Sequence, residues 1–284
     1  MAFCLGSRLI VNSPLTEYLR EAALQFKVIE LQADPSYFSA NYALTVNEKK
    51  VLRIYRERYG FQLTMHAPFI NLRLGAINLE ERQLAINIMI NAMQAASDLE
   101  IQLVTFHPCT LEPGAPEKYH ENSLLEEGSI ALLLKVAKKL GITLLMENMP
   151  LVPEFHSKTT DGSRFQELLW LFPEPEFGLT IDIGHALQAG IPPEGLLKMD
   201  RIRHFHLHEN DRTIDNHQPI TTHLEWWEKL FKTLTKKFPD AYGILEMSQF
   251  TDQIASLKEL QPFLGKRALP KPGKGQMIPP LIVD

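Results

Sequence analysis

Histidine and carboxylate side chains recur along this chain at the ends of short apolar runs. Six successive runs end at or next to such a residue, in the order His66, His107, Glu147, Asp182, His206 and Glu246. Ionisable side chains rarely stand directly after buried apolar segments unless they are paired or bind a metal. Imidazole and carboxylate donors together suit Zn, Mn, Fe or Co better than Mg or Ca alone. The pattern therefore predicts a divalent-metal site.

The charges of this set also favour a cation. If Glu147, Asp182 and Glu246 share one confined space, their carboxylates repel one another, and a divalent ion removes that penalty. A single histidine such as His66 or His107, each close to a proline, can instead simply end a strand. Unrelated coincidences in six consecutive runs are a poor explanation of the whole set.

Other polar residues near these ends allow more than one interpretation. His204 shares a strand face with His206 and His208, because side chains alternate along a strand. His204 lies deeper and is expected to be packed or hydrogen-bonded, whereas His208 is expected to support a ligand. Glu30 is either a polar residue of the rim or a substrate contact. Cys109 is expected to be a small buried residue rather than a nucleophile.

Eight apolar runs must position these residues. They are Phe3–Val11, Lys27–Leu31, Phe61–His66, Leu103–His107, Ile142–Glu147, Gly178–Ile183, Ile202–His208 and Tyr242–Met247. Such runs are typical of parallel strands buried on both faces, and the segments between them have helical patterns. Eight strand–helix units predict a single (β/α)8 TIM barrel, whose active site lies at the carboxyl ends of the strands. A doubly wound open sheet is the alternative, but Leu5-Gly6-Ser7 is not the glycine-rich turn that follows its first strand.

Local signals predict helix boundaries. Thr45-Val-Asn-Glu48 and Thr222-His-Leu-Glu225 both have the spacing of a capping box. Gly141 predicts the end of a helix over Ser129–Leu140. A buried stripe is expected at Leu84, Ile88, Ala92 and Ala96.

The chain is expected to form one domain with a tail. The barrel is predicted over residues 1–264, and a Pro/Gly-rich irregular extension over residues 265–284. Asn148–Gly162, which contains Pro150 and Pro153, is a candidate lid over the site.

The composition is that of a folded, mildly acidic domain. The chain has 284 residues, 45% hydrophobic content and a net charge of −5, which allows one large core and excludes the disordered class. No apolar run approaches the roughly 20 residues of a membrane helix, and the first residues lack the features of a signal peptide. Two cysteines are too few for a disulfide framework, so a cytoplasmic location is expected.

The motifs around the site residues occur in a characteristic order. They are Leu63-Thr-Met-His66-Ala-Pro, Thr105-Phe-His107-Pro, Leu145-Met-Glu147-Asn, Ile181-Asp182-Ile-Gly-His185-Ala and His204-Phe-His206-Leu-His-Glu-Asn-Asp-Arg212. Together they resemble the xylose isomerase-like TIM-barrel superfamily. That group contains sugar isomerases and epimerases, and also the endonuclease IV family of apurinic endonucleases (AP endonuclease family 2). The resemblance covers the third to eighth runs, which is most of the chain.

Similarity to the ketose 3-epimerase branch implies a metal-dependent isomerase or epimerase that acts on a small sugar, sugar phosphate or polyol. Its single ion would be held by Glu147, Asp182, His206 and Glu246. Glu147 and Glu246 would also be the catalytic pair that moves a proton beside a carbonyl, through an enediolate that the metal stabilises. The substrate-binding residues would be His185, Arg212, His66 and His107.

Two stretches depart from that branch. Pro153 stands where a glutamate is expected after the glutamate of the fifth run. Ile214-Asp-Asn-His-Gln-Pro219 replaces a glycine-rich turn after the arginine.

Similarity to endonuclease IV implies instead up to three zinc ions and abasic DNA as substrate. All nine ligands of that family have candidates, at His66, His107, Glu147, Asp182, His185, His206, Asp215, His217 and Glu246. However, Asp182-Ile-Gly-His185 and His206-Leu-His-Glu209 differ from the Asp-Thr-Cys-His and His-Leu-Asn-Asp of that family. No basic loop for tracking a DNA backbone is evident either.

We therefore expect a divalent metal (Mn, Zn, Co or Mg) and a sugar substrate, with nucleic acid only under the alternative. No membrane partner is expected, and a homo-oligomer is compatible with the sequence. A non-catalytic metal-binding scaffold is the third interpretation.

Overall fold

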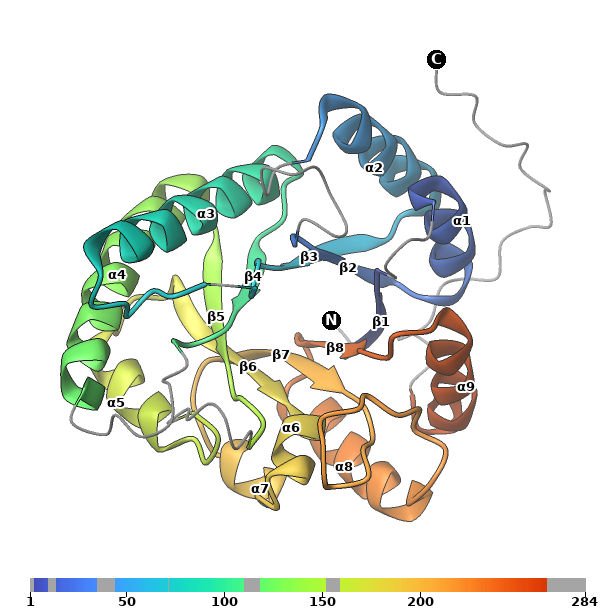
Figure 1. Cartoon of the computed structure of the whole chain (residues 1–284). Helices are drawn as coiled ribbons and strands as arrows, with labels where there is room; N and C mark the ends of the chain where they lie inside the picture. Colours follow the sequence, from blue (N-terminus) through green and yellow to red (C-terminus); the bar gives the residue numbers. More distant parts are fainter. Residues whose placement is uncertain are drawn as a thin grey trace.

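The computed structural model describes residues 3–9, 14–34, 44–70, 72–109, 118–151 and 159–264. Within them, eight parallel strands close into a barrel in chain order, with β1 paired to β8. The strands are β1 (Cys4–Arg8), β2 (Val28–Gln32), β3 (Gln62–His66), β4 (Leu103–Phe106), β5 (Thr143–Glu147), β6 (Phe177–Asp182), β7 (Ile202–Leu207) and β8 (Tyr242–Leu245). The predicted (β/α)8 TIM barrel is thus confirmed (Figure 1).

Helices surround the barrel (Figure 1). They are α1 (Leu15–Gln25), α2 (Val46–Tyr59), α3 (Leu79–Asp98), α4 (Tyr119–Leu140), α5 (Ser163–Leu171), α6 (Ile183–Gln188), α7 (Pro193–Leu196), α8 (Leu224–Lys237) and α9 (Phe250–Leu260), followed by the short 3-10 helix η2 (Gln261–Phe263). Apolar residues such as Leu19, Met89 and Phe231 are buried in the core. None of the helices in the described ranges combines the length and apolar character needed to cross a membrane.

The strands end at or just before the predicted site residues. Strands β3, β5 and β6 end at His66, Glu147 and Asp182, and β8 ends one residue before Glu246. Strand β1 is shorter than the first predicted run and ends at Arg8. Because all strands of a parallel barrel point the same way, these ends meet at one mouth.

One of the two predicted capping boxes forms. The Thr45 hydroxyl accepts from the Glu48 backbone N–H at 3.1 Å, and the Glu48 carboxylate accepts from the Thr45 N–H at 2.6 Å. The prediction at Thr222 was wrong, because α8 is preceded by His223, whose φ is 49° and whose side chain makes no capping bond. The His223 ring lies instead 3.2 Å from the carboxylate of Glu209, so a tertiary contact overrides the local signal.

Two other helix predictions were right in part. Helix α3 buries three of the four stripe residues, but Leu84 is 60% exposed. Each four-residue step advances about 40° around a helix, so a strict spacing of four drifts off the buried face. Helix α4 ends at Gly141, with φ 70°, as predicted, but begins at Tyr119 rather than Ser129.

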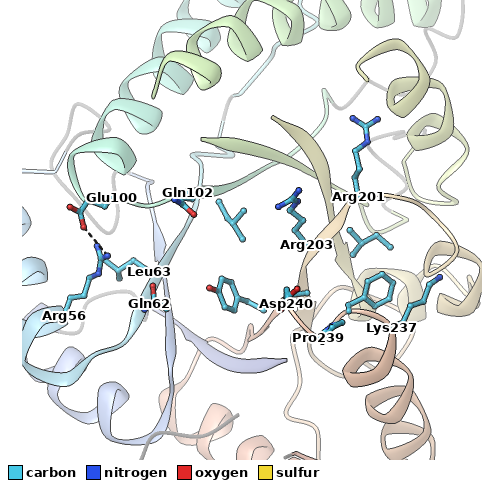
Figure 2. A pocket seen from close by; sticks show the side chains of 15 residues that line it. Arg56, Gln62, Leu63, Glu100, Gln102, Arg201, Arg203, Lys237, Pro239 and Asp240 are labelled. Atoms are coloured by element: carbon cyan, nitrogen blue, oxygen red, sulfur yellow. Dashed lines mark ion pairs between the residues drawn. The ribbon is translucent and has the colours of Figure 1, made fainter. Parts of the chain in front are cut away.

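A hollow of about 870 Å³ lies at the opposite end of the barrel. It is lined by the first residues of four strands, Gln62, Leu103, Ile202 and Tyr242. Figure 2 shows it with the ion pair between Arg56 and Glu100, whose closest atoms are 3.2 Å apart. TIM-barrel enzymes react at the carboxyl ends of their strands, so we look for the functional site at the other mouth.

Replacing Thr45 by alanine removes the acceptor that caps α2. We expect the free energy of unfolding to fall by about 1 kcal/mol. Thr222→Ala is the matched control and should change it by less than about 0.5 kcal/mol, since no cap forms there. Urea unfolding followed by circular dichroism measures both, and equal losses would contradict the assignment of the caps.

Candidate metal centre

The carboxyl ends of the strands and the loops that follow them bring all the predicted metal ligands into three adjoining groups. In each group, one donor atom from every member lies within 4.8 Å of the others. We name them the His66 centre (His66, His107, Glu147), the Glu246 centre (Glu147, Asp182, His206, Glu246) and the Asp215 centre (His185, His208, Asp215, His217). Each mixes imidazole with carboxylate, the donor set that suits a transition-metal ion.

Glu147 belongs to two of these centres. Its Oε2 lies 3.3 Å from Nε2 of His66 and 3.3 Å from Nε2 of His107. Its Oε1 lies 2.9 Å from Nδ1 of His206. A carboxylate that presents one oxygen to each of two donor groups has the geometry needed to bridge two cations, so the His66 and Glu246 centres fit neighbouring ions.

The Glu246 centre surrounds Nδ1 of His206 with carboxylates. That nitrogen is 2.9 Å from Glu147, 3.1 Å from Glu246 and 3.7 Å from Asp182. All four side chains are buried, and Oδ2 of Asp182 has no hydrogen-bond partner among the described residues. Buried carboxylates so close together require compensating positive charge, and Arg8 supplies part of it through a 2.8 Å contact with Glu246.

Backbone carbonyls fix the orientation of three histidine rings. Nδ1 of His66 lies 2.7 Å from the Ala67 carbonyl oxygen, and Nδ1 of His185 lies 2.7 Å from that of Asn148. Nδ1 of His217 lies 2.6 Å from the Glu246 carbonyl oxygen. Since a carbonyl only accepts, Nδ1 must carry the proton and donate it.

The other nitrogen of each ring, Nε2, then faces another atom that could bind a metal. Nε2 of His66 is 3.2 Å from Nε2 of His107. Nε2 of His185 and Nε2 of His217 lie 3.2 Å and 3.0 Å from the same oxygen, Oδ2 of Asp215. In neutral rings the lone pairs of His185 and His217 are directed at a carboxylate oxygen, an arrangement that either a proton on Nε2 or a bound metal ion stabilises. Ligand histidines are typically held in this way by a bond to the second ring nitrogen.

The pKa values show the same demand for positive charge. Burial alone would lower the pKa of His185, but the carboxylates of Asp182 and Asp215 raise it well above its ordinary value. Burial would also lower the pKa of His217, but the carboxylates of Asp215 and Glu246 outweigh this effect and raise it. The pKa of Asp215 is lowered, because His185 and His217 overcome the effect of burial. Without metal, bound protons therefore neutralise this centre.

The loop after β7 folds back to carry Asp215 and His217 to the mouth. Two backbone hydrogen bonds between Glu209 and Gln218, of 2.9 and 2.6 Å, close the loop at its base. Asp211 accepts bonds from backbone and side-chain groups within the turn. His217 has φ 46°, a left-handed conformation that is unusual for a residue other than glycine.

Glu30 lies below the rim of the barrel, where neither a polar rim residue nor a substrate contact was expected. Its side chain is fully buried, with carboxylate oxygens 3.1 Å from Nε2 of His206 and 3.2 Å from Nε2 of His204. It thus holds the side of the His206 ring that faces away from the Glu246 centre. Burial lowers the pKa of His204 to about 4, so this histidine is neutral, and it is packed as expected.

Other predicted residues lie outside the three centres. Arg212 is exposed with φ 64°, and its backbone N–H donates to Asn210. Burial raises the pKa of Cys109 to about 12, which does not suit a nucleophile. Residues 152–158 of the candidate lid lie outside the described residues, as does the tail 265–284.

Arg8 was not anticipated as a site residue. It is the last residue of β1 and contacts Glu246, but the first predicted run continued to Val11 and hid this strand end. A charged residue inside an apolar run was the signal that could have located it.

Comparison with known proteins agrees with this architecture. The family model of the xylose isomerase-like TIM barrel matches residues 19–266. The chain belongs to this family. The xylose isomerase-like resemblance inferred from the motifs is therefore confirmed.

Members and structural relatives are similar over most of their length. An uncharacterized protein of Methanocaldococcus jannaschii, MJ1311, is 26% identical over 229 residues, 78% of this chain and 74% of the relative. A D-tagatose 3-epimerase-like protein superposes with a TM-score of 0.78 at 25% identity, covering 93% of this chain and 97% of that one. The 3-keto-D-glucoside 4-epimerase of E. coli superposes with a TM-score of 0.72 at 13% identity, covering 92% and 98%.

Metal binding to this xylose isomerase-like barrel is expected to release protons. His185 and His217 have raised pKa values and must lose a proton before Nε2 can bind an ion. The apparent affinity for Zn²⁺ should therefore increase as the pH is raised, and it should level off once the pH exceeds the pKa values of both histidines. Calorimetric titration in buffers of different ionisation enthalpy counts the protons, and binding without proton release at neutral pH would contradict this charge balance.

Proposed function

We propose that the chain is a divalent-metal-dependent isomerase or epimerase that acts on a small sugar or polyol. The observation that carries this proposal is the Glu246 centre, where Glu147 and Glu246 both lie within 3.1 Å of Nδ1 of His206. Two glutamates from different strand ends thus approach one buried point. The similarity to a D-tagatose 3-epimerase-like protein supports the same reaction class.

The donor set of this centre fits a divalent ion, which when bound would polarise a carbonyl and a neighbouring hydroxyl of the sugar. Glu147, Asp182, His206 and Glu246 would hold it. Glu147 is the last residue of β5 and Glu246 follows β8, so the two carboxylates approach from different sides of the barrel. One carboxylate removes a proton from the carbon beside the carbonyl. The other residue, in its protonated form, donates a different proton to the opposite face, which inverts that carbon, and exchange with solvent restores both groups.

Electrostatics keep both glutamates ready to accept a proton. Burial would raise the pKa of Glu246, but the positive charges of His206 and Arg8 lower it below its ordinary value. For Glu147, burial is likewise outweighed by His206 and by hydrogen bonds from His107, so its pKa is well below normal. Each side chain can therefore act as an ionised base, and the one that donates a proton must first take it up from solvent.

The proposed proton transfer is tested by hydrogen exchange from solvent. The metal-loaded chain is incubated with a panel of ketoses in D₂O, and deuterium at the carbon beside the carbonyl is measured by NMR. Glu246→Gln should lower the rate by about 100-fold or more. Glu225→Gln, an exposed glutamate at the start of α8, is the control and should leave it unchanged. Exchange that persists in Glu246→Gln would exclude this role.

Phosphodiester hydrolysis is the second candidate, and a specific observation favours it. Glu147 bridges the His66 and Glu246 centres, and the Asp215 centre adjoins them, so the donors fit three ions. Sites with more than one metal suit in-line displacement at phosphorus.

Metal analysis separates the two candidates. An epimerase needs an ion for catalysis only in the Glu246 centre, whereas the hydrolase needs ions in all three centres and predicts nicking of abasic DNA. His107→Asn should abolish nicking by removing a ligand of the His66 centre. If the zinc-loaded chain leaves abasic DNA intact, the second candidate is excluded.

A further inference from the structure

The Asp215 centre contains one histidine more than the predicted ligand set. We infer that His208 is its fourth protein ligand, and that this centre holds a divalent ion in a closed position that fixes the loop after β7. The inference goes beyond the proposed function, because it gives this ion a structural task whichever reaction the Glu246 centre performs.

The His208 ring is oriented for this role. The side chain is fully buried, and its Nδ1 lies 3.2 Å from the Glu209 carbonyl oxygen, to which it donates. Nε2 then presents a lone pair. It lies 3.2 Å from Oδ1 of Asp182 and 3.8 Å from Oδ1 of Asp215, and has no hydrogen-bond partner among the residues that the structure describes. A buried lone pair aimed at two carboxylate oxygens calls for a cation.

The backbone at Gly184 leaves space for the His208 ring. A Cβ at Gly184 would lie 2.0 Å from Cε1 and 2.3 Å from both nitrogens of His208. Any side chain at position 184 would therefore displace the imidazole. On its other side the ring stacks on His217, with centroids 3.9 Å apart and planes 9° from parallel. Because the lone pair of an imidazole lies in the ring plane, one of the two rings has to tilt for both to bind the same ion.

Two departures from the endonuclease IV motifs thus form one structural feature. The glycine of Asp182-Ile-Gly-His185 leaves the space that the histidine of His206-Leu-His-Glu209 fills. The His208 ring fits here only because residue 184 has no side chain, so the two positions are linked.

Four protein donors have a definite consequence for the chemistry. Structural zinc sites are usually tetrahedral with four protein ligands. The Glu246 centre also has four protein donors, but three of them are carboxylates, which suit an ion of higher coordination number that keeps room for substrate, whereas three of the four donors of the Asp215 centre are imidazoles. The donors come from α6 (His185), the residue after β7 (His208) and the following loop (Asp215 and His217). An ion there would tie these three segments together. His185 would then be a ligand of this ion instead of holding a sugar oxygen.

Cobalt provides a direct test. The full chain, stripped of metal, is titrated with Co²⁺ while visible absorption and bound metal are measured. The wild type should develop the intense absorption of four-coordinate cobalt. His208→Asn should lose this band and bind the corresponding ion more than about 100-fold more weakly, which exceeds the 10–100-fold cost of losing a residue that merely orients a ligand. His120→Asn, an exposed histidine of α4, should match the wild type.

A second variant tests the space at position 184. Gly184→Ala should displace the ring and weaken the same cobalt position, and it should lower the melting temperature. Adding His208→Asn to Gly184→Ala should restore the melting temperature of the metal-free chain and weaken cobalt binding no further, because both changes remove the same ligand.

The outcomes are decisive and independent of the proposed function. An unchanged cobalt band in His208→Asn, even with weaker binding, overturns the inference, as does additive loss of cobalt in the double variant. If the four-coordinate band is present and depends on His208, but no ketose exchanges deuterium, the epimerase proposal fails while the structural ion remains supported.

Discussion

Concentrated negative charge at one mouth of the barrel is the constraint on which the site depends. Glu147, Asp182 and Glu246 are buried there, with Asp215 beside them. Removing carboxylates from water is costly unless positive charge accompanies them. Arg8 and the protonated histidines supply that charge in the absence of metal. The same geometry would form a set of ion sites once the protons leave, so the proposed metal binding follows from the need to compensate these buried carboxylates.

The backbone contributes to this solution as much as the side chains do. Carbonyl groups of Ala67, Asn148 and Glu246 hold the rings of His66, His185 and His217 with Nε2 directed inward. These carbonyls belong to residues at or just beyond strand ends, where the ladder no longer uses them. The end of each strand therefore both presents a donor and orients a neighbouring one.

The fold, and the gathering of the predicted site residues at one mouth of the barrel, could be predicted from the sequence for identifiable physical reasons. Strands buried on both faces produce continuous apolar runs, and a parallel barrel brings their ends together, so His66 and Glu147 could be assigned to one mouth without coordinates. The division of the donors among three centres could not be predicted in this way. That division depends on which oxygen of Glu147 faces which histidine, and side-chain rotation of this kind leaves no periodic signal in the sequence.

The features that were missed depend on contacts between distant segments. The Thr222 capping box failed because His223 bonds to Glu209 instead. Glu30 was interpreted as either a polar rim residue or a substrate contact, since the sequence does not reveal that it lies behind His206. Helix and strand propensities describe a segment alone, whereas these positions are set by partners far along the chain.

The hydrogen-bonded base of the loop after β7 separates two parts of that loop. Glu209 and Gln218 clamp its ends, and the donors at Asp215 and His217 stand near the clamp, while Arg212 and Ile214 form an exposed tip. Insertions or substitutions at the tip can lengthen the loop or change its charge without moving Asp215 and His217. Changes at the tip would therefore alter what can enter this mouth of the barrel while leaving the buried imidazole and carboxylate groups in place.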